Sequence, residues 1–225
     1  MKLVLVAGLA LTTTLLAVDR APARRLAESA SVFSEIMATP DEGIPQDLLE
    51  KVHCIVIVPE LKTAAFIIGG KYGKGYLFCR NKGGSGWSAP ATVRLEGGSF
   101  GFQIGGSETD LIMLVMSARG AGKLLESKST LGAEGPVAAG PVGRTATAQT
   151  DAQMHAEILS WSRSQGLFAD VALEGATLRE DLDDNATLYG SNLDNRDIVT
   201  DGRAASESGV RLIGLLDKYS DRRER

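Results

Sequence analysis

Apolar residues recur at helical spacing in two segments, one near each end of the chain. In residues 20–38, Leu26, Ala30, Phe33 and Met37 fall three or four positions apart and form one apolar face. Residues 206–219 repeat this spacing with Leu212, Leu215, Leu216 and Tyr219. Both segments are predicted to be amphipathic helices.

Three shorter helices are predicted from terminal signals. Pro45 suits the first turn of a helix over residues 45–52, and Ser117 is a suitable cap for one over 117–128. Thr150 or Asp151 caps a predicted helix that ends at Gly166. Its apolar face is expected to comprise Met154, Ile158 and Trp161.

Short apolar runs bounded by turn residues predict β-strands. They cover residues 53–58, 64–69, 75–80, 92–96, 99–104, 110–116 and 167–173. The glycine-rich segment 131–150 is expected to extend the sheet at an edge, because its prolines cannot donate ladder hydrogen bonds. Without an internal repeat or long linker, the pattern predicts one α+β domain with a mostly antiparallel, glycine-rich β-sheet flanked by helices.

Composition narrows the choice of partner. The 225 residues are 44% hydrophobic and carry a net charge of −4, so no global basic field indicates nucleic acid. An anionic partner would therefore have to meet a local basic patch.

The first 23 residues are predicted to be a targeting segment. Lys2 precedes an apolar run that is shorter than a membrane-spanning helix requires, which favours a signal peptide ending near Ala17 or Ala23. An uncleaved anchor is the alternative. Export to the periplasm or cell envelope would permit a disulfide between Cys54 and Cys79, although two buried free thiols fit the sequence equally well.

Two nucleotide- or metal-binding motifs are incomplete. Gly73-Lys74 lacks both the upstream glycine and the following hydroxyl residue of a phosphate-binding loop. The acidic stretch from Asp181 lacks the glycine and glutamate of a calcium loop, so an acid-capped, solvated helix start is favoured. No metal or other cofactor is predicted.

A serine hydrolase is one alternative function. Gly97-Gly98-Ser99-Phe100-Gly101 matches the nucleophile-elbow pattern, and Asp110 or Asp151 precedes His155 in the required order. The strand predicted after Ser99, where an elbow needs a helix, argues against this function.

Basic residues suggest a second function. Five of them fall in one short span whose only acid is Glu60, and two more lie on the first predicted helix. Together they are predicted to contact anionic lipid headgroups: Arg24, Arg25, Lys62, Lys71, Lys74, Arg80 and Lys82. The bases could instead solvate turns. The mixed signs of charge on the first helix favour docking of Phe33 on the protein's own core over membrane insertion.

Four long segments resemble one known family. They are IPQDLLEKVHCIVIVPELKTAAFIIGGKYGKGYLFCR, GWSAPATVRLEGGSFGFQIGGSETDLIMLVM, LGAEGPVAAGPVGR and SRSQGLFADVALEGATLREDLDDNATLYG. These resemble the SYLF domain, also called the Ysc84 actin-binding or DUF500 family. The resemblance runs from about Arg24 to Gly190 and leaves residues 191–225 as a variable helix and charged tail.

The resemblance implies a phospholipid-binding module without catalysis. Eukaryotic relatives bind phosphoinositides and some bind actin, whereas bacterial members are commonly exported. It also implies that the glycine–lysine stretch 69–78 forms turns of a lipid-facing sheet. Peripheral binding to an anionic membrane is thus the leading hypothesis, with a serine hydrolase (Ser99, His155) and a protein-interaction scaffold as alternatives.

Overall fold

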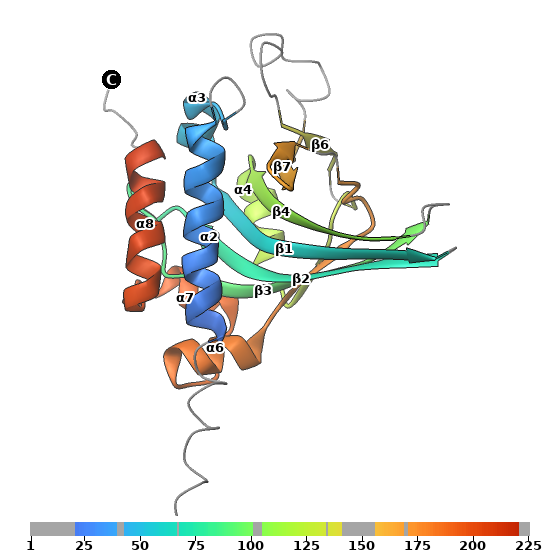
Figure 1. The fold of residues 1–225 in the computed structure, drawn as a ribbon. Helices are drawn as coiled ribbons and strands as arrows, with labels where there is room; N and C mark the ends of the chain where they lie inside the picture. The colour runs from blue at the N-terminus through green and yellow to red at the C-terminus, as the bar shows by residue number, and fades with distance from the viewer. Residues whose placement is uncertain are drawn as a thin grey trace, which may run out of the picture.

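A mostly antiparallel β-sheet forms the centre of the computed structural model (Figure 1). The structure describes residues 21–39, 43–66, 68–100, 105–133, 135–140, 156–168 and 171–220. Within these ranges, eight strands lie in the order β5-β9-β3-β2-β1-β4-β7-β6, and β8 pairs with β7. The only parallel pair among them joins β6 to β7, so the sheet is mixed. The predicted α+β class is confirmed.

The strands pair with their chain neighbours at β1–β2, β2–β3, β6–β7 and β7–β8, whereas β4 pairs with β1 and β7, and β9 pairs with β3 and β5. Their bounds are β1 Cys54–Phe66, β2 Ile68–Cys79, β3 Ala91–Phe100, β4 Gly105–Val115, β5 Lys128–Thr130, β6 Val137–Ala139, β7 Ile158–Ser164, β8 Leu167–Phe168 and β9 Thr177–Glu180. The helices are α2 Ala21–Ala38, α3 Gln46–Lys51, α4 Ala118–Leu124, α6 Leu182–Tyr189, α7 Asn195–Thr200 and α8 Glu207–Ser220. None of the described helices is long and apolar enough to cross a membrane.

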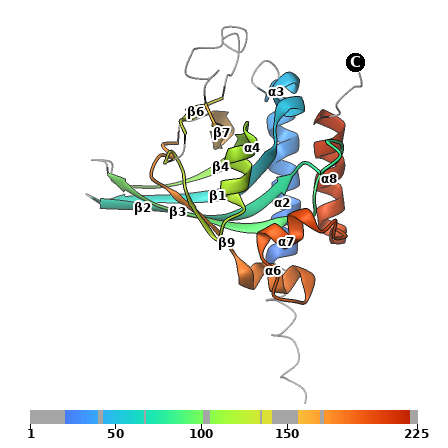
Figure 2. The same cartoon turned by 180° about the vertical axis from the view of Figure 1, so that it is seen from behind.

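Helices cover both faces of the sheet, as the view from behind shows (Figure 2). On one face, α2, α3 and α8 bury a core that includes Ile55 and Ile57. On the other face, α4 and α7 pack over a second core that includes Cys54, Val56 and Val58. Because successive residues of β1 point to opposite cores, CIVIV is apolar throughout instead of alternating with polar residues.

The first helix docks on the protein's own core, as predicted. Leu26, Ala30 and Phe33 are fully buried, and Phe33 makes an edge-to-face contact with Tyr219 of α8 at 5.9 Å between ring centroids. Leu212 and Leu216 of α8 belong to the same core. The sequence therefore located both helices and their buried faces.

Three of the predicted strands belong to two longer ones. The runs 53–58, 64–69 and 75–80 belong to only two strands, β1 and β2, which pair from Cys54↔Cys79 to Phe66↔Ile68. The glycine–lysine stretch 69–78 therefore lies within β2, and the expectation that it forms turns is wrong. Its glycines leave room for atoms of the neighbouring strand, since a Cβ at Gly73 would lie 2.7 Å from a Val58 methyl group.

Two predicted helices and one predicted strand differ from the structure. Residues 158–164 form the strand β7, not a helix. Ile158 packs in the core on one face of the sheet and Trp161 in the core on the other face. Of the strand predicted over 167–173, residues 167–168 form β8, in a hairpin that turns at Gln165 and Gly166, both with positive φ, and the described residues 171–173 are not in a strand. Ser117 does cap α4, but the helix ends at Leu124 and residues 128–130 form β5.

Some predicted features lie outside the described residues. These are the targeting segment before Ala21, and both Asp151 and His155 of the hydrolase hypothesis. The segment 131–150 does extend the sheet in its described part, where β6 lies at an edge directly after Pro136.

Candidate functional site

Four of the seven predicted lipid-binding residues line one pocket at the N-terminal end of α2. Arg24, Arg25, Lys62 and Lys74 surround a space of about 260 Å³ together with Tyr72. Glu28 and Glu60 also line this space, so its charge is mixed. We call this space the α2 pocket.

The two outer cations of the α2 pocket face solvent. The side chain of Arg24 is 79% exposed and pairs with Glu28 at 3.1 Å. The side chain of Lys62 is 64% exposed and lies 3.4 Å from Glu108, which is equally exposed. Tyr72, which sequence reasoning did not single out, is 46% exposed and pairs directly with Lys62 across β1 and β2. Its position within a basic strand run is the signal that could have identified it.

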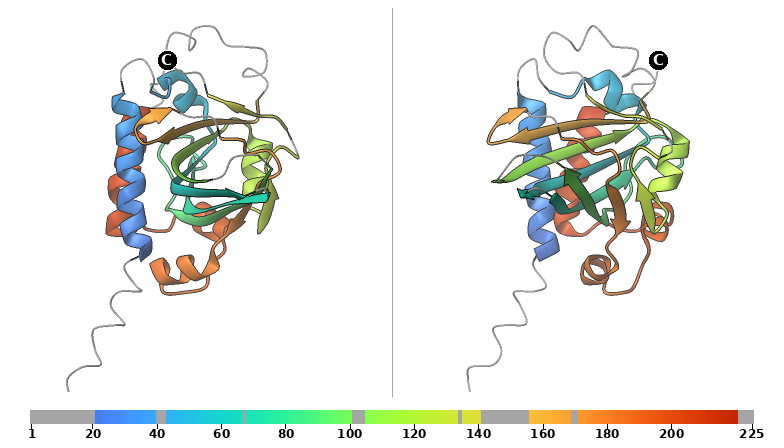
Figure 3. Two further views of the ribbon diagram at one scale, coloured as in Figure 1. Left: turned by 45° about the vertical axis from the view of Figure 1, so that its right-hand side comes forward. Right: turned by 90° about the vertical axis from the view of Figure 1, so that its right-hand side faces the viewer.

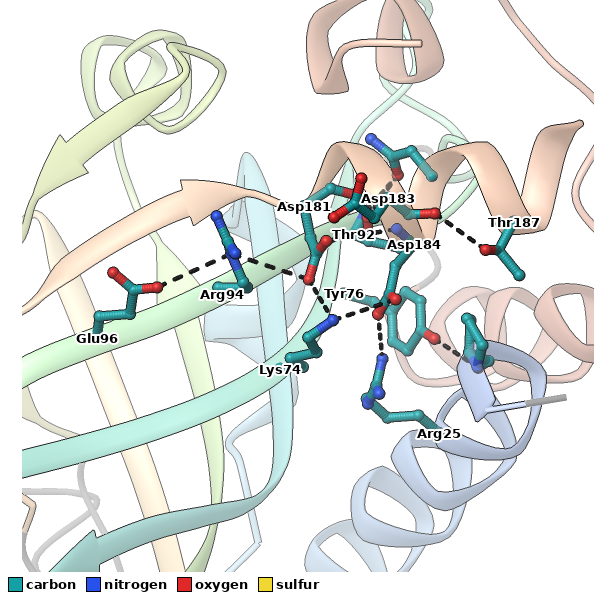
Figure 4. Close-up of polar contacts among 12 residues, drawn as sticks. Arg25, Lys74, Tyr76, Thr92, Arg94, Glu96, Asp181, Asp183, Asp184 and Thr187 are labelled. Atoms are coloured by element: carbon teal, nitrogen blue, oxygen red, sulfur yellow. Dashed lines mark hydrogen bonds and ion pairs between the residues drawn. The ribbon is translucent and has the colours of Figure 1, made fainter. Parts of the chain in front are cut away.

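The two inner cations are held by carboxylates of the α6 start (Figure 4). Arg25 lies 2.6 Å from Asp184, and Lys74 lies 2.7 Å from Asp181 and 3.2 Å from Asp184. Burial disfavours the charged form of Lys74, yet its hydrogen bonds to both aspartates outweigh this effect and raise its pKa. These pairs join α2, β2 and α6.

Asp181 is buried and has two structural roles. Its side chain accepts a hydrogen bond from the Asp184 N–H and so caps α6, as the acidic motif predicted. The residue is only 2% exposed, however, so the expected solvated helix start is wrong at this position. Asp181 also lies 3.9 Å from Arg94, which in turn lies 3.8 Å from Glu96. Figure 4 shows this chain of charges extending along β3.

A buried polar cluster anchors the same corner of the fold. The Asn185 side chain accepts hydrogen bonds from both the N–H and the hydroxyl of Thr92, and donates to Asn195 at 2.8 Å. Tyr76 is fully buried, and its hydroxyl donates to the Pro22 carbonyl at 2.5 Å. These hydrogen bonds connect α6 to β3 and α7, and α2 to β2, beside the α2 pocket.

Two further predicted bases support the fold instead of facing a ligand. Lys71 is buried, its ammonium group donates to the Ala172 carbonyl, and desolvation lowers its pKa. Arg80 donates to the carbonyls of Leu49 and Ser220 and stacks on Trp87, with 4.3 Å from its guanidinium carbon to the ring centroid. Lys71 and Lys74 are three positions apart in β2, so they lie on opposite faces of the sheet.

The seventh base, Lys82, lies at a different pocket of about 670 Å³. Cys54 and Cys79 also line this pocket, and they form a disulfide between directly paired positions of β1 and β2. This settles the alternative left open by the sequence in favour of the disulfide. The structure thus separates Lys82 from the residues of the α2 pocket.

The hydrolase candidates do not assemble in the described part of the chain. Ser99 lies in β3, a strand that continues to Phe100, not at a sharp turn into a helix. Asp110 accepts a hydrogen bond from the Glu60 N–H at 3.2 Å and lies 3.9 Å from Arg163. Burial raises the pKa of Asp110, although the Glu60 N–H and Arg163 oppose this shift. Among the described residues, no cluster of three metal-ligating side chains occurs.

Comparisons with known proteins identify relatives over most of the domain. The sequence profile of the Ysc84 family, described as "Las17-binding protein actin regulator", matches residues 96–219, a range that continues past Gly190 into α8. Protein YSC84 of Saccharomyces cerevisiae is 32% identical over 180 residues, which cover 79% of this chain and 38% of the relative. LAS seventeen-binding protein 3 of the same yeast is 34% identical over 155 residues, 68% of this chain and 33% of the relative.

A human protein resembles a longer part of the chain. SH3 domain-containing YSC84-like protein 1 of Homo sapiens is 28% identical over 208 residues, which cover 91% of this chain and 60% of the relative. The chain thus spans less than two thirds of each of these three relatives. The profile match over more than half of the chain shows that this protein belongs to the Ysc84 family.

Proposed function

We propose that this protein binds peripherally to anionic phospholipid surfaces and performs no catalysis. One observation carries the proposal: Arg24, Lys62 and the half-exposed Tyr72 gather at a single pocket beside the start of α2. Two cations and an amphipathic aromatic ring in one exposed place suit the headgroup region of a membrane.

The ion pairs of these two cations are easily exchanged. Both the Arg24–Glu28 and the Lys62–Glu108 pairs are exposed, and such pairs contribute at most about 1 kcal/mol. A lipid phosphate can therefore replace the carboxylate at small cost. Arg25 and Lys74, by contrast, are paired with the partly buried Asp184, and Lys74 also with the buried Asp181, so we assign both cations a structural role in the pocket wall.

The proposed attraction is local and sensitive to salt. With a net charge of −4, the whole chain does not favour an anionic surface, so binding depends on the few cations that reach it. Each such cation contributes about 1 kcal/mol near an anionic leaflet, and salt screens this attraction over a Debye length of about 8 Å at physiological ionic strength.

Vesicle co-sedimentation with two matched variants tests the proposal. Lys62 and Lys51 are equally exposed, at 64% and 68%, and each pairs with one exposed acid. Lys51 lies in α3, which is located near the C-terminal end of α2, far from the start of α2 (Figure 1). Lys62→Glu is expected to weaken binding to vesicles containing phosphatidylserine, whereas Lys51→Glu leaves binding unchanged.

The wild-type protein gives the decisive comparison. Its binding should increase with the phosphatidylserine content and fall with added salt. Equal binding to purely zwitterionic and to anionic vesicles would refute the proposal, as would an equal loss of binding in both lysine variants.

Binding of a protein partner is the second candidate function. It is favoured by the family description, which names Las17 binding and actin regulation. Co-sedimentation with actin filaments in the absence of lipid tests it directly. If the Lys62→Glu variant still binds filaments, the protein partner binds a surface separate from the lipid site. If the wild-type protein does not sediment with filaments, actin is not the partner.

We further propose that the domain acts in the cell envelope. The disulfide between Cys54 and Cys79 supports this location, because such bonds persist in oxidising compartments. Protein isolated under acid quench from its native cell should resist thiol alkylation at both cysteines. Full alkylation of both, detected by mass spectrometry, would place the protein in a reducing compartment instead.

A further inference from the structure

The central strands project beyond the helices as an arm. In Figures 1 and 2, β1, β2, β3 and β4 extend away from α2 and α8 towards one side of the molecule. The side views of Figure 3 show the curved sheet beside the helices (left) and in front of them (right). We define the arm as the distal parts of these four strands: residues 63–66, 68–70, 97–100 and 105–107.

Residues that are paired directly across the strands of the arm form rows, and each row contains side chains of a similar kind. Gly106, Ala64, Gly70 and Gly98 are directly paired neighbours in one row. Phe66, Ile68 and Phe100 are directly paired in the last row of β1, β2 and β3. In sequence, residues 63–70 and 97–107 contain no charged side chain, although 23% of the chain is charged. The described part of the arm therefore ends in an apolar row, with the row of small residues next to it.

No described side chain covers the row of small residues. A Cβ at Gly98 would meet no atom within 4 Å, and at Gly70 and Gly106 the nearest atoms are backbone oxygens at 3.8 and 3.6 Å. Ala64 and the three glycines are exposed. This part of the sheet is consequently available to a partner outside the described chain.

A polar row marks the base of the arm. Glu108, Lys62, Tyr72 and Glu96 are directly paired across β4, β1, β2 and β3. Phe66 lies four positions after Lys62 along β1, which corresponds to about 13 Å at 3.3 Å per residue. Tyrosine and lysine are the residue types that gather at the boundary between a membrane and water.

We propose that the arm enters the boundary between headgroups and acyl chains of a phospholipid bilayer, with the row of Phe66, Ile68 and Phe100 leading. This inference rests on the proposed membrane binding and adds which part of the fold penetrates the lipid. Interfacial elements bury their apolar face about 5–10 Å deep, so the row of Lys62 and Tyr72 then lies at the level of the headgroups.

Open strand edges limit how deeply the arm can enter the bilayer. Within the described residues, β9 pairs with β3 only as far as Glu96, and β7 pairs with β4 only from Asp110 onwards. The outer edges of the arm therefore have no neighbouring strand there. Unpaired backbone groups are costly in hydrocarbon, so the arm stays where water and headgroups reach it and does not span the bilayer.

Fluorescence quenching locates the arm relative to the lipid. Phe66→Trp places a reporter in the end row, while the native Trp87 and Trp161 are 5% and 1% exposed and contribute little to quenching. Val210→Trp is the matched control, because Val210 is a 59% exposed apolar residue of α8, away from the arm (Figure 1). Spin labels on acyl carbons near the headgroup are expected to quench the tryptophan at position 66 and not the one at position 210.

The outcomes separate this inference from the proposed function. If the Phe66→Trp protein sediments with anionic vesicles but its added tryptophan is not quenched, the arm inference is overturned and membrane binding stands. If neither variant sediments, the proposed function itself fails. Quenching at both positions would indicate non-specific adsorption and would also overturn the arm inference.

A charge placed in the end row gives an independent measurement. Phe100→Asp is expected to weaken partition into anionic vesicles by about tenfold, whereas Val210→Asp has no effect; both should keep the wild-type melting temperature. Light scattering without lipid tests pairing of two arms between copies of the chain. A dimer that Phe100→Asp dissociates would overturn the inference in favour of self-association.

Discussion

Gly75 of β2 lies against the backbone of Ile57 in β1, so closely that a Cβ at position 75 would collide with the Ile57 carbonyl oxygen and lie 2.8 Å from the Val58 Cα. The cause is a bulge in β1. Four residues, 58–61, stand opposite three in β2 between the pairs Ile57↔Tyr76 and Lys62↔Tyr72, and Glu60 has a positive φ of 51°. The bulge bends β1 across β2 and leaves room only for a hydrogen atom at position 75.

Replacing this glycine should be far more harmful than replacing one on the arm. Gly75→Ala is expected to lower the free energy of unfolding by about 2–3 kcal/mol or more, because backbone has to move. Gly70→Ala, in the same strand with its nearest neighbour at 3.8 Å, should change it by less than about 1 kcal/mol. Urea unfolding of both variants decides the matter, and equal effects would contradict the steric explanation.

Lys74 should stabilise the fold by neutralising Asp181. Lys74→Met leaves this buried carboxylate with only the more distant Arg94 and is expected to destabilise by about 2–3 kcal/mol, somewhat less than a fully buried pair. Lys62→Met, which breaks an exposed pair, should change stability by less than about 1 kcal/mol. The difference follows from burial, because the side chain of Lys74 is mostly covered and that of Lys62 is mostly exposed.

A double variant separates charge from packing at this pair. Asp181→Asn retains an oxygen that can cap α6 but removes the negative charge. It should therefore recover part of the stability lost in Lys74→Met when both changes are combined. Additive losses in chemical denaturation would show that the pair interacts weakly.

Tyr76 should make the protein lose stability in alkaline solution. Burial raises the pKa of its hydroxyl above the ordinary value of 10.0, so the folded state retains a proton that the unfolded state releases. Its contribution is fully present below pH 10 and is lost as the pH rises through the folded-state pKa. Tyr76→Phe should cost about 1 kcal/mol at pH 8 through the lost bond to Pro22.

The pH profile provides the check on Tyr76. Between pH 8 and pH 10.5, the wild-type free energy of unfolding should fall more than that of Tyr76→Phe, since both proteins keep Tyr189 but only the wild type carries the buried phenol of Tyr76. Parallel profiles for the two proteins would remove Tyr76 from the alkaline transition.

Phe33 should affect folding and not membrane binding. Phe33→Ala is expected to destabilise by about 3–5 kcal/mol, because the ring is fully buried against α8. Phe33→Asp should lower the melting temperature further, while the fraction that remains folded binds vesicles as the wild type does. Arg24→Ala in the same helix should barely change the melting temperature. Loss of vesicle binding at an unchanged melting temperature in Phe33→Asp would instead place Phe33 in the lipid.

Periodicity predicted the helices best where each has one buried face. In α2 and α8, apolar residues three and four apart do fall on the packed side. The same spacing misled the interpretation of Ile158 and Trp161, which lie on opposite faces of β7, each against a different core. A strand buried on both faces has no period-two signal, so spacing alone does not distinguish it from a helix.

The candidate site was predicted only in part, for a related reason. The sequence identified Arg24, Arg25, Lys62 and Lys74, which do gather at one pocket. It did not reveal which of them would be neutralised, because the carboxylates of Asp181 and Asp184 lie more than a hundred residues further along the chain. Long-range pairing by α6 therefore decides which bases remain exposed.

The contact between α2 and α8 also governs how the chain can be made. Phe33 contacts Tyr219, so part of the apolar side of the first described helix stays uncovered until α8 has been synthesised, even after α2 has packed on β1 and β2. During translation, nearly the whole domain has to emerge before this core closes, and α2 meanwhile exposes a surface that other chains or a chaperone can bind. A ribosome stalled before Leu212 should accordingly hold a protease-sensitive chain, however complete its sheet.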